Sequence, residues 1–296
     1  MEKAVTSEYE AYGEVTLTSA GVPIVLSRYP FSDTAPVVIF LPGTMAHPLF
    51  YDSFLCKLAR AGFNVVGLHF ISHGKSPRVR EDFRFEDMVQ NVRDTVAYCA
   101  AHYRGDLFLL GSSQGGIIAT AAADDPRLKA VFVHDTILPE LEESARLLHL
   151  PRWLYPAARP LLGLFRLVAA IFPTFQVGLT DYLDPDRVTI SEALKERYFN
   201  DPLSRKSYPL GFLSSLFHAD MHAATDGSIR CPFVLIAAKE DPLFEFSYIE
   251  KVYEKIVAPE KELMAFDLSA HILFIEEEDA VLGPIVRRLR KLTTKA

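Results

Sequence analysis

The sequence lacks the features of an exported or membrane-spanning protein. Its three cysteines, Cys56, Cys99 and Cys231, lie in apolar stretches without metal-ligand spacing, so we expect buried reduced thiols and a cytoplasmic location. The first 14 residues carry four glutamates and have neither the basic start nor the apolar core of a signal peptide. The most apolar stretch, residues 160–172, spans about 13 residues, whereas a membrane-crossing helix needs roughly 20.

Positive charge is also scarce. The 31 lysines and arginines are outnumbered by 38 acidic residues, the net charge is -7, and no long basic run is present. Nucleic acid is therefore not an expected partner, because a protein that tracks a phosphate backbone needs clustered positive charge. What remains is a composition of 49% hydrophobic and 23% charged residues, typical of a globular chain with a sizeable core. A length of 296 residues fits one large domain with an insertion, or two ordinary domains.

Strand and helix patterns alternate along most of the chain. Two strands joined by a turn at residues 20–22 open it, at Gly13–Ser19 and Pro23–Tyr29. Further apolar runs predict strands at Pro36–Leu41, Phe63–Phe70, Asp106–Gly111, Ala130–His134, Pro232–Ala238 and Glu262–Leu268. Helical spacing predicts helices at Leu49–Ala61, Phe85–His102, Ile117–Ala123 and Ala280–Leu292. This alternation is typical of an α/β fold with a mostly parallel central sheet flanked by helices.

The alternation stops between residues 139 and 220. This stretch is rich in Leu, Phe, Pro and Arg, has helical periodicity and shows few strand signals. We expect a helical lid at 139–220, inserted into a core formed by residues 1–138 and 221–296. Most of its apolar residues are expected to pack on the core, and a surplus of them above an active site favours a tunnel for an apolar chain.

A catalytic motif follows the strand at residues 106–111. Gly111-Ser112-Ser113-Gln114-Gly115 matches G-x-S-x-G, directly after an apolar strand and directly before a helix. In such a turn the serine has a strained backbone, so Gly111 and Gly115 leave room where side chains would collide. The helix that follows directs its first N–H groups, including that of Gln114, at a developing oxyanion. The pattern predicts Ser113 as a nucleophile.

With this motif the chain resembles the α/β-hydrolases, and among them the lysophospholipase and monoacylglycerol lipase group with a helical lid. In that group the first buried strand ends in His-Gly-x, and the x residue gives the second oxyanion N–H. Here Leu41-Pro42-Gly43-Thr44 lies at the matching place, so the resemblance assigns this role to Thr44. Pro42 departs from the family pattern because it replaces the histidine.

Two other segments resemble this group. Ser72-His73-Gly74-Lys75-Ser76 corresponds to its G-H-G-x-S turn, with serine for the first glycine, and we interpret His73 as structural. Asn200-Asp201-Pro202-Leu203 resembles a segment near the end of the lid.

A serine nucleophile needs a base and an acid that orients the base. Of nine histidines, only His271 follows the last predicted strand, where the family places its base. Asp241 ends the strand before it and matches the family position of the acid. Asp135, after the strand at residues 130–134, is the alternative, because some α/β-hydrolases place their acid there. The other histidines lack metal-ligand spacing such as H-E-x-x-H, so neither a metal nor another cofactor is expected.

The sequence therefore predicts a serine hydrolase that cleaves carboxylic esters with apolar acyl chains, of the monoacylglycerol or lysophospholipid type. The alternatives are acyl transfer to another acceptor, cleavage of a thioester, amide or carbon–carbon bond by the same triad, or a binding protein without turnover. Four arginines between residues 146 and 166 suggest a transient contact of the lid with a membrane surface. The sequence does not indicate the oligomeric state.

Overall fold

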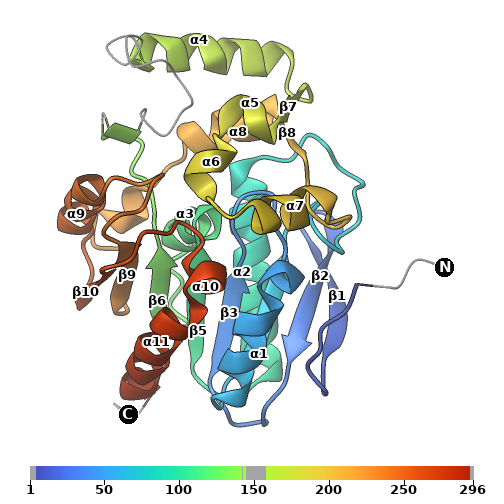
Figure 1. Cartoon of the computed structure of the whole chain (residues 1–296), viewed down its shortest axis with the longest axis vertical. Helices are drawn as coiled ribbons and strands as arrows, with labels where there is room; N and C mark the ends of the chain where they lie inside the picture. The colour runs from blue at the N-terminus through green and yellow to red at the C-terminus, as the bar shows by residue number, and fades with distance from the viewer. Residues whose placement is uncertain (1–4, 142, 145–157, 294–296) are drawn as a thin grey trace.

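A mostly parallel sheet of eight strands forms the centre of the protein (Figure 1). The computed structural model describes residues 5–141, 143–144 and 158–293. The strands are β1 (Gly13–Ser19), β2 (Val22–Tyr29), β3 (Val37–Leu41), β4 (Asn64–His69), β5 (Leu107–Ser112), β6 (Leu128–His134), β7 (Gln176–Gly178), β8 (Ser207–Pro209), β9 (Phe233–Ala238) and β10 (Lys261–Phe266). The large sheet has the order β1-β2-β4-β3-β5-β6-β9-β10. In it β2 runs antiparallel to both of its neighbours, β1 and β4, and the other neighbouring pairs are parallel. The predicted α/β fold class is confirmed.

Helices cover both faces of this sheet. Those among the described residues are α1 (Asp52–Arg60), α2 (Phe85–His102), α3 (Gln114–Ala121), α4 (Ala158–Ile171), α5 (Leu179–Tyr182), α6 (Pro185–Val188), α7 (Glu192–Asn200), α8 (Leu210–Phe217), α9 (Phe246–Lys255), α10 (Leu273–Glu276) and α11 (Glu278–Thr293), with 3-10 turns η1 (Pro48–Tyr51) and η4 (His222–Ala224). In Figure 1, α1 and α11 lie in front of the sheet and α2 lies behind it.

The core forms two apolar layers because side chains alternate across each buried strand. In β3, Val37 and Ile39 contact the layer under α2 and α3, whereas Val38 and Phe40 contact the layer under α1 and α11. All five β3 residues are buried, which explains why this strand appears in the sequence as an unbroken apolar run. The three cysteines are buried in these layers.

The strand order brings four loops together at one edge of the sheet. Strands β5, β6, β9 and β10 are neighbours and run parallel, so the loops at their carboxyl ends lie side by side. These loops carry Ser113, Asp135, Asp241 and His271 in that order.

The chain between β6 and β9 lies beyond this edge, with α4 at the top of Figure 1. It contains α4–α8 and a small antiparallel sheet of β7 and β8, which the sequence did not indicate. Three residues per strand are too few for an alternating pattern to stand out. α4 packs on α8. Residues 145–157, part of the expected lid, lie outside the described residues. Within the described ranges, no helix has the length and apolar character needed to cross a membrane.

Candidate active site

Ser113 lies in the sharp turn between β5 and α3. Its backbone has φ 50° and ψ -117°, a conformation that L residues rarely adopt. Two glycines make this turn sterically feasible. A Cβ added at Gly111 would lie 2.4 Å from the Gly115 carbonyl oxygen, and one added at Gly115 would lie 2.1 Å from the Leu41 carbonyl oxygen. The glycine spacing seen in the sequence thus has a direct steric cause.

Hydrogen bonds connect Ser113 to His271 and His271 to Asp241. His271 Nε2 lies 2.9 Å from Ser113 Oγ, and His271 Nδ1 lies 2.8 Å from Asp241 Oδ2. The other Asp241 oxygen, Oδ1, accepts the N–H groups of Leu243 at 2.7 Å and Phe244 at 2.8 Å. Three loops thus bring a hydroxyl, an imidazole and a carboxylate into the order that general-base activation of a serine requires.

The charges of these residues affect one another. Burial raises the pKa of Asp241, but the His271 ring and the backbone N–H groups outweigh burial and hold that pKa below its ordinary value. Burial lowers the pKa of His271, while the Asp241 and Asp135 carboxylates reverse this effect and raise that pKa above its ordinary range. Asp241 is therefore the ionised partner that stabilises a protonated His271.

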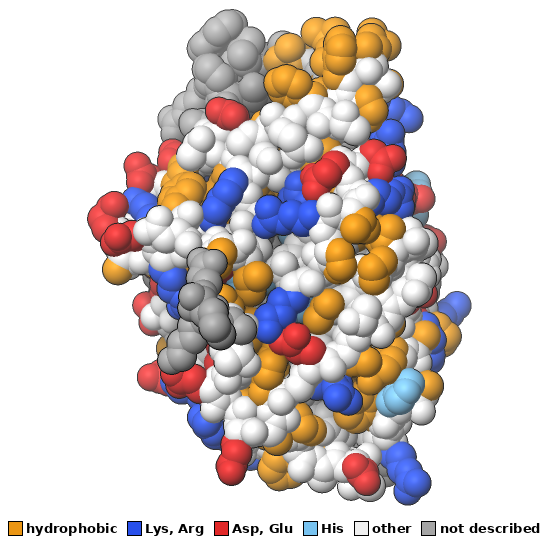
Figure 2. All heavy atoms as spheres, turned by 90° about the vertical axis from the view of Figure 1, so that its right-hand side faces the viewer, with side chains coloured by type: hydrophobic (Ala, Val, Ile, Leu, Met, Phe, Trp, Pro, Cys, Tyr) orange, Lys and Arg blue, Asp and Glu red, His pale blue; other side chains and the backbone are white. Residues whose placement is uncertain are grey.

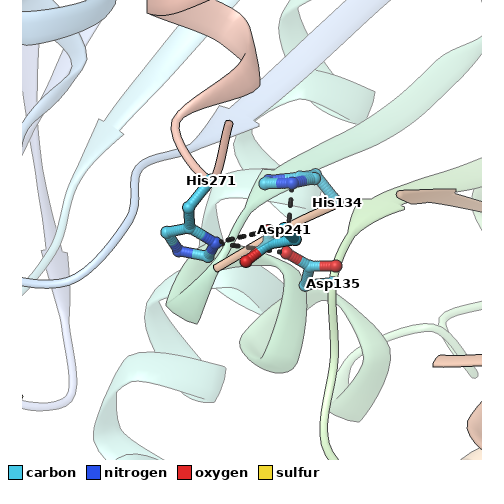
Figure 3. Close-up of side chains that lie close together, drawn as sticks. All are labelled: His134, Asp135, Asp241 and His271. Carbon is cyan, nitrogen blue, oxygen red and sulfur yellow. Dashed lines mark hydrogen bonds and ion pairs between the residues drawn. The ribbon is translucent and has the colours of Figure 1, made fainter. Parts of the chain in front are cut away.

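Asp135, the alternative acid, also reaches His271 (Figure 3). Its Oδ2 lies 3.5 Å from His271 Nδ1 and 3.1 Å from His134 Nε2, and its side chain is fully buried. Burial and the neighbouring Asp241 carboxylate raise the pKa of Asp135 to about 7. Burial lowers the pKa of His134 to about 3, so His134 is neutral. The structure therefore brings both candidate acids to the same ring, with the shorter contact from Asp241.

The two residues expected to stabilise an oxyanion also lie beside Ser113. Gln114 is the first residue of α3, and the first N–H groups of a helix have no acceptor within it. Thr44 follows β3 and lines the same cavities as Ser113. Gly43 precedes Thr44, and a Cβ there would lie 2.9 Å from the Tyr51 hydroxyl, so a side chain at this position would displace Tyr51.

Tyr208, which sequence reasoning missed, links these two segments. Its buried hydroxyl accepts hydrogen bonds from Met45 N–H at 2.8 Å and from Gln114 Nε2 at 2.9 Å. The same hydroxyl lies 3.0 Å from His73 Nε2. His73 Nδ1 donates to the Ile71 carbonyl at 2.6 Å, so Nε2 of the neutral ring accepts the Tyr208 proton. No sequence signal marks this link, because 163 residues separate Tyr208 from Met45.

This network gives two predicted segments a structural place. Burial lowers the pKa of His73 well below its ordinary value, so the ring is neutral and serves as the acceptor for Tyr208. Asp201, in the segment 200–203, has its Oδ2 2.7 Å from Nε2 of His47, which lies three residues after Thr44. The His73 contact anchors the chain between β6 and β9 to the loop after β4, and the His47 contact anchors it to the loop after β3.

The cluster of His134, Asp135, Asp241 and His271 has the composition of a metal site, and its ligand atoms lie within 4.8 Å of one another. Both nitrogens of His271 already contact Ser113 and Asp241. A metal ion at this cluster would compete with those contacts, so the donor set fits the serine, histidine and aspartate arrangement better than a metal.

An apolar cavity of about 670 Å³, counting the part open to solvent, reaches Ser113 and His271. Its lining from the chain between β6 and β9 includes Leu179, Leu183, Val188, Leu194, Tyr198 and Phe199. A second cavity of about 440 Å³ also reaches Ser113, and its polar lining includes Thr44, Gln114 and Tyr182. Ser113 thus faces two cavities, and apolar side chains form most of the lining of each.

Residues 32–278 match the family described as "Serine aminopeptidase, S33". The comparison with curated protein sequences gives no match. Among solved structures, the chain is similar to a monoacylglycerol lipase from Paleococcus ferrophilus, with 20% identity, 91% of this chain and 99% of that chain covered, and a TM-score of 0.73.

A soluble variant of monoglyceride lipase from Saccharomyces cerevisiae, in complex with a substrate analog, gives 16% identity, 95% and 96% coverage, and a TM-score of 0.75. A lipase in an open form gives 21% identity, 96% and 100% coverage, and a TM-score of 0.74. These likenesses show a shared fold. Since the family match spans most of the sequence, this chain is an α/β-hydrolase and belongs to the serine aminopeptidase, S33 family.

Proposed function

We propose that the protein is a serine esterase that hydrolyses carboxylic esters with apolar acyl chains, of the monoacylglycerol or lysophospholipid type. The observation that carries this proposal is the hydrogen-bonded line of Ser113, His271 and Asp241 at an apolar cavity. The monoacylglycerol and monoglyceride lipases among the structural neighbours agree with it.

The reaction follows from these contacts. Ser113 Oγ attacks the ester carbonyl carbon while His271 Nε2 takes its proton. Asp241 stabilises the imidazolium that forms, and the backbone N–H groups of Gln114 and Thr44 donate to the oxyanion. His271 then gives its proton to the departing alcohol. A water molecule, deprotonated by His271, attacks the acyl-enzyme and releases the acid.

The cavities favour an ester over a peptide, although the family description names aminopeptidases. An aminopeptidase has to bind the positive amino group of its substrate, which calls for a carboxylate nearby. Among the described residues that line either cavity, none is acidic. The larger cavity suits an acyl chain, and the smaller one offers Gln114, Thr44 and Tyr182 to the alcohol part.

The outer face of α4 supports a role for the chain between β6 and β9 as a lid that meets lipid. Leu164, Leu167 and Ile171 are 57%, 59% and 61% exposed, and Phe172 and Phe175 beyond the helix are 58% and 64% exposed. Figure 2 shows hydrophobic side chains gathered at this end of the molecule. Of the four arginines, Arg166 is exposed, whereas Arg146, Arg152 and the side chain of Arg159 lie outside the part of the chain that is described. An apolar face with adjacent positive charge fits transient contact with an anionic membrane surface.

The test is hydrolysis of p-nitrophenyl esters from acetyl to palmitoyl, with Ser113→Ala as the matched control. We expect the rate to peak at medium or long chains and to fall by several orders of magnitude in the variant, because the nucleophile is absent. Inactivity of the wild type at every length, with a fluorophosphonate probe still labelling Ser113, would mean that another bond is cleaved. Full activity of Ser113→Ala would refute the assignment of the nucleophile.

A further inference from the structure

Two carboxyl groups, Asp135 and Asp241, approach the same nitrogen of His271 from two neighbouring loops (Figure 3). The proposed mechanism needs only one of them. The reason for their proximity is the strand order, because β6 and β9 pair in parallel and both residues lie just past the carboxyl ends of these strands. Asp135 N–H donates to the Ile236 carbonyl of β9, which fixes the height of the two carboxyl groups relative to each other.

The backbone holds Asp135 firmly in this place. Its φ of 57° lies in the left-handed region, which aspartate and asparagine tolerate better than most residues. The preceding carbonyl, of His134, accepts the N–H of Ser113 at 2.8 Å. A Cβ added at Gly116 of α3 would lie 2.3 Å from the Asp135 carbonyl oxygen. Asp135 is therefore part of the packing that also shapes the turn of Ser113.

The surroundings of the two carboxyl groups differ. Asp241 Oδ1 accepts hydrogen bonds from two backbone N–H groups, and Oδ2 lies 2.8 Å from His271 Nδ1. These contacts stabilise the ionised form of Asp241. Asp135 is fully buried, and neither of its carboxyl oxygens has a well-aligned hydrogen bond among the described residues. The titratable side chains that face it are His134 from β6, Asp241 from the loop after β9 and His271 from the loop after β10, while α3 presents the Gly116 backbone.

Two carboxylates this close in a buried site do not both ionise at low energetic cost. We propose that Asp135 and Asp241 form a pair that carries one negative charge beside His271 Nδ1, with the charge on Asp241 and a proton on Asp135 in the resting enzyme. Asp135 is then a positioning residue that can replace Asp241 as the anion by releasing its proton to solvent. The raised pKa of Asp135 and the lowered pKa of Asp241 agree with this distribution.

The proposal rests on the proposed esterase function for its kinetic consequences, and a set of four proteins tests it: the wild type, Asp135→Asn, Asp241→Asn and the double variant. We expect Asp241→Asn to lower kcat/KM by about 10²-fold and the double variant by about 10⁴-fold, since only the single variant keeps a reserve anion. The remaining activity of Asp241→Asn should rise with pH as Asp135 loses its proton, and this rise should begin below pH 7, because the variant lacks the Asp241 carboxylate that helps to raise the pKa of Asp135. Asp135→Asn should lower kcat/KM by less than about tenfold, since asparagine resembles the neutral acid.

The protonation state of Asp135 can be measured without a substrate, by infrared spectroscopy. A buried carboxylic acid gives a carbonyl stretching band in infrared spectra, and we expect this band in the wild type and its loss in Asp135→Asn. Asp226→Asn is the matched control, because Asp226 is exposed and lies before the opposite end of β9. The Tm of each variant verifies folding, and asparagine suits the left-handed backbone at position 135.

Three results would overturn the pair: equal activity of Asp241→Asn and the double variant, a loss in Asp135→Asn as large as that in Asp241→Asn, or an infrared band that persists in Asp135→Asn. If the wild type hydrolyses no ester, the proposed function fails by itself. The rates at which a fluorophosphonate labels Ser113 in the four proteins, together with the infrared band, then still test the pair.

Discussion

Two regions of the molecule line the same cavities: the carboxyl edge of the sheet and the chain between β6 and β9. They differ in how strongly packing restricts their residues. At the edge, Ser113 lies in a strained turn flanked by two glycines, and a Cβ added at either glycine would collide with a backbone oxygen. In the chain between β6 and β9, α4 leaves apolar side chains exposed to solvent, and a Cβ added at Gly163 in this helix would meet no atom within 4 Å. We conclude that positions near the reacting atoms are fixed by backbone packing, whereas the exposed face of α4 tolerates changes. The chain between β6 and β9, which includes α4, is called the covering segment below.

The largest contrast should come from one substitution made in both regions. Gly115→Ala places a methyl group against the Leu41 carbonyl oxygen and should lower kcat/KM by about 10²-fold or more, because the nucleophile is displaced. Gly163→Ala, its matched control, should raise the free energy of unfolding by about 0.5–1 kcal/mol, because alanine favours a helix. Ester kinetics and thermal unfolding measure both effects. Similar activities of the two variants would break the contrast.

The covering segment should control chain length. Leu194 of α7 is buried and lines the larger cavity, so Leu194→Trp should fill space meant for an acyl chain. We expect the rate for palmitoyl relative to acetyl p-nitrophenyl ester to fall about tenfold, the effect of roughly 1–3 kcal/mol of overpacking. Ile190→Trp, at a position that is 81% exposed, is the control. An unchanged ratio in Leu194→Trp would place the acyl chain in the smaller cavity.

Tyr208 connects the two regions. It belongs to β8 in the covering segment, and its hydroxyl contacts Met45 and Gln114 at the carboxyl edge of the sheet. Tyr208→Phe removes an acceptor from two buried donors, so we expect kcat to fall about tenfold with little change in KM. Steady-state kinetics with a short ester measures this split. Tyr253→Phe, which removes a half-buried hydroxyl bonded to Lys261, is the control. A rise in KM alone would show that Tyr208 acts on substrate binding.

The smallest effect on hydrolysis is expected on the outer face of α4. Leu167→Ser with Ile171→Ser should leave hydrolysis of a short soluble ester within about twofold, because both side chains are exposed. Binding to vesicles of phosphatidylcholine and phosphatidylglycerol should weaken about tenfold, since less apolar surface enters the lipid. Cosedimentation measures this binding, with Val79→Ser as a control at another exposed apolar position. Unchanged binding would exclude α4 as the contact.

The same contrast explains what the sequence could predict. Buried strands such as β3 appear as continuous apolar runs, and the turn of Ser113 has a steric requirement that two glycines express locally. Apolar runs also predicted β9, which precedes Asp241, and β10, which precedes His271. The β7–β8 pair and the Tyr208 link were not, because they depend on contacts between residues far apart in the sequence. The approach of both aspartates to His271 follows from the strand order β5-β6-β9-β10, which no local pattern encodes.

The burial of the three cysteines has a practical consequence for following the covering segment in solution. Burial raises the pKa of the Cys56 and Cys231 thiols, the latter to about 11, so few of these groups are thiolates at neutral pH. Alkylating reagents should therefore react slowly with the native protein. A single cysteine placed on exposed α4, for example Leu164→Cys, would accept a fluorophore or spin label in the otherwise natural sequence, so that motion of α4 can be observed during turnover.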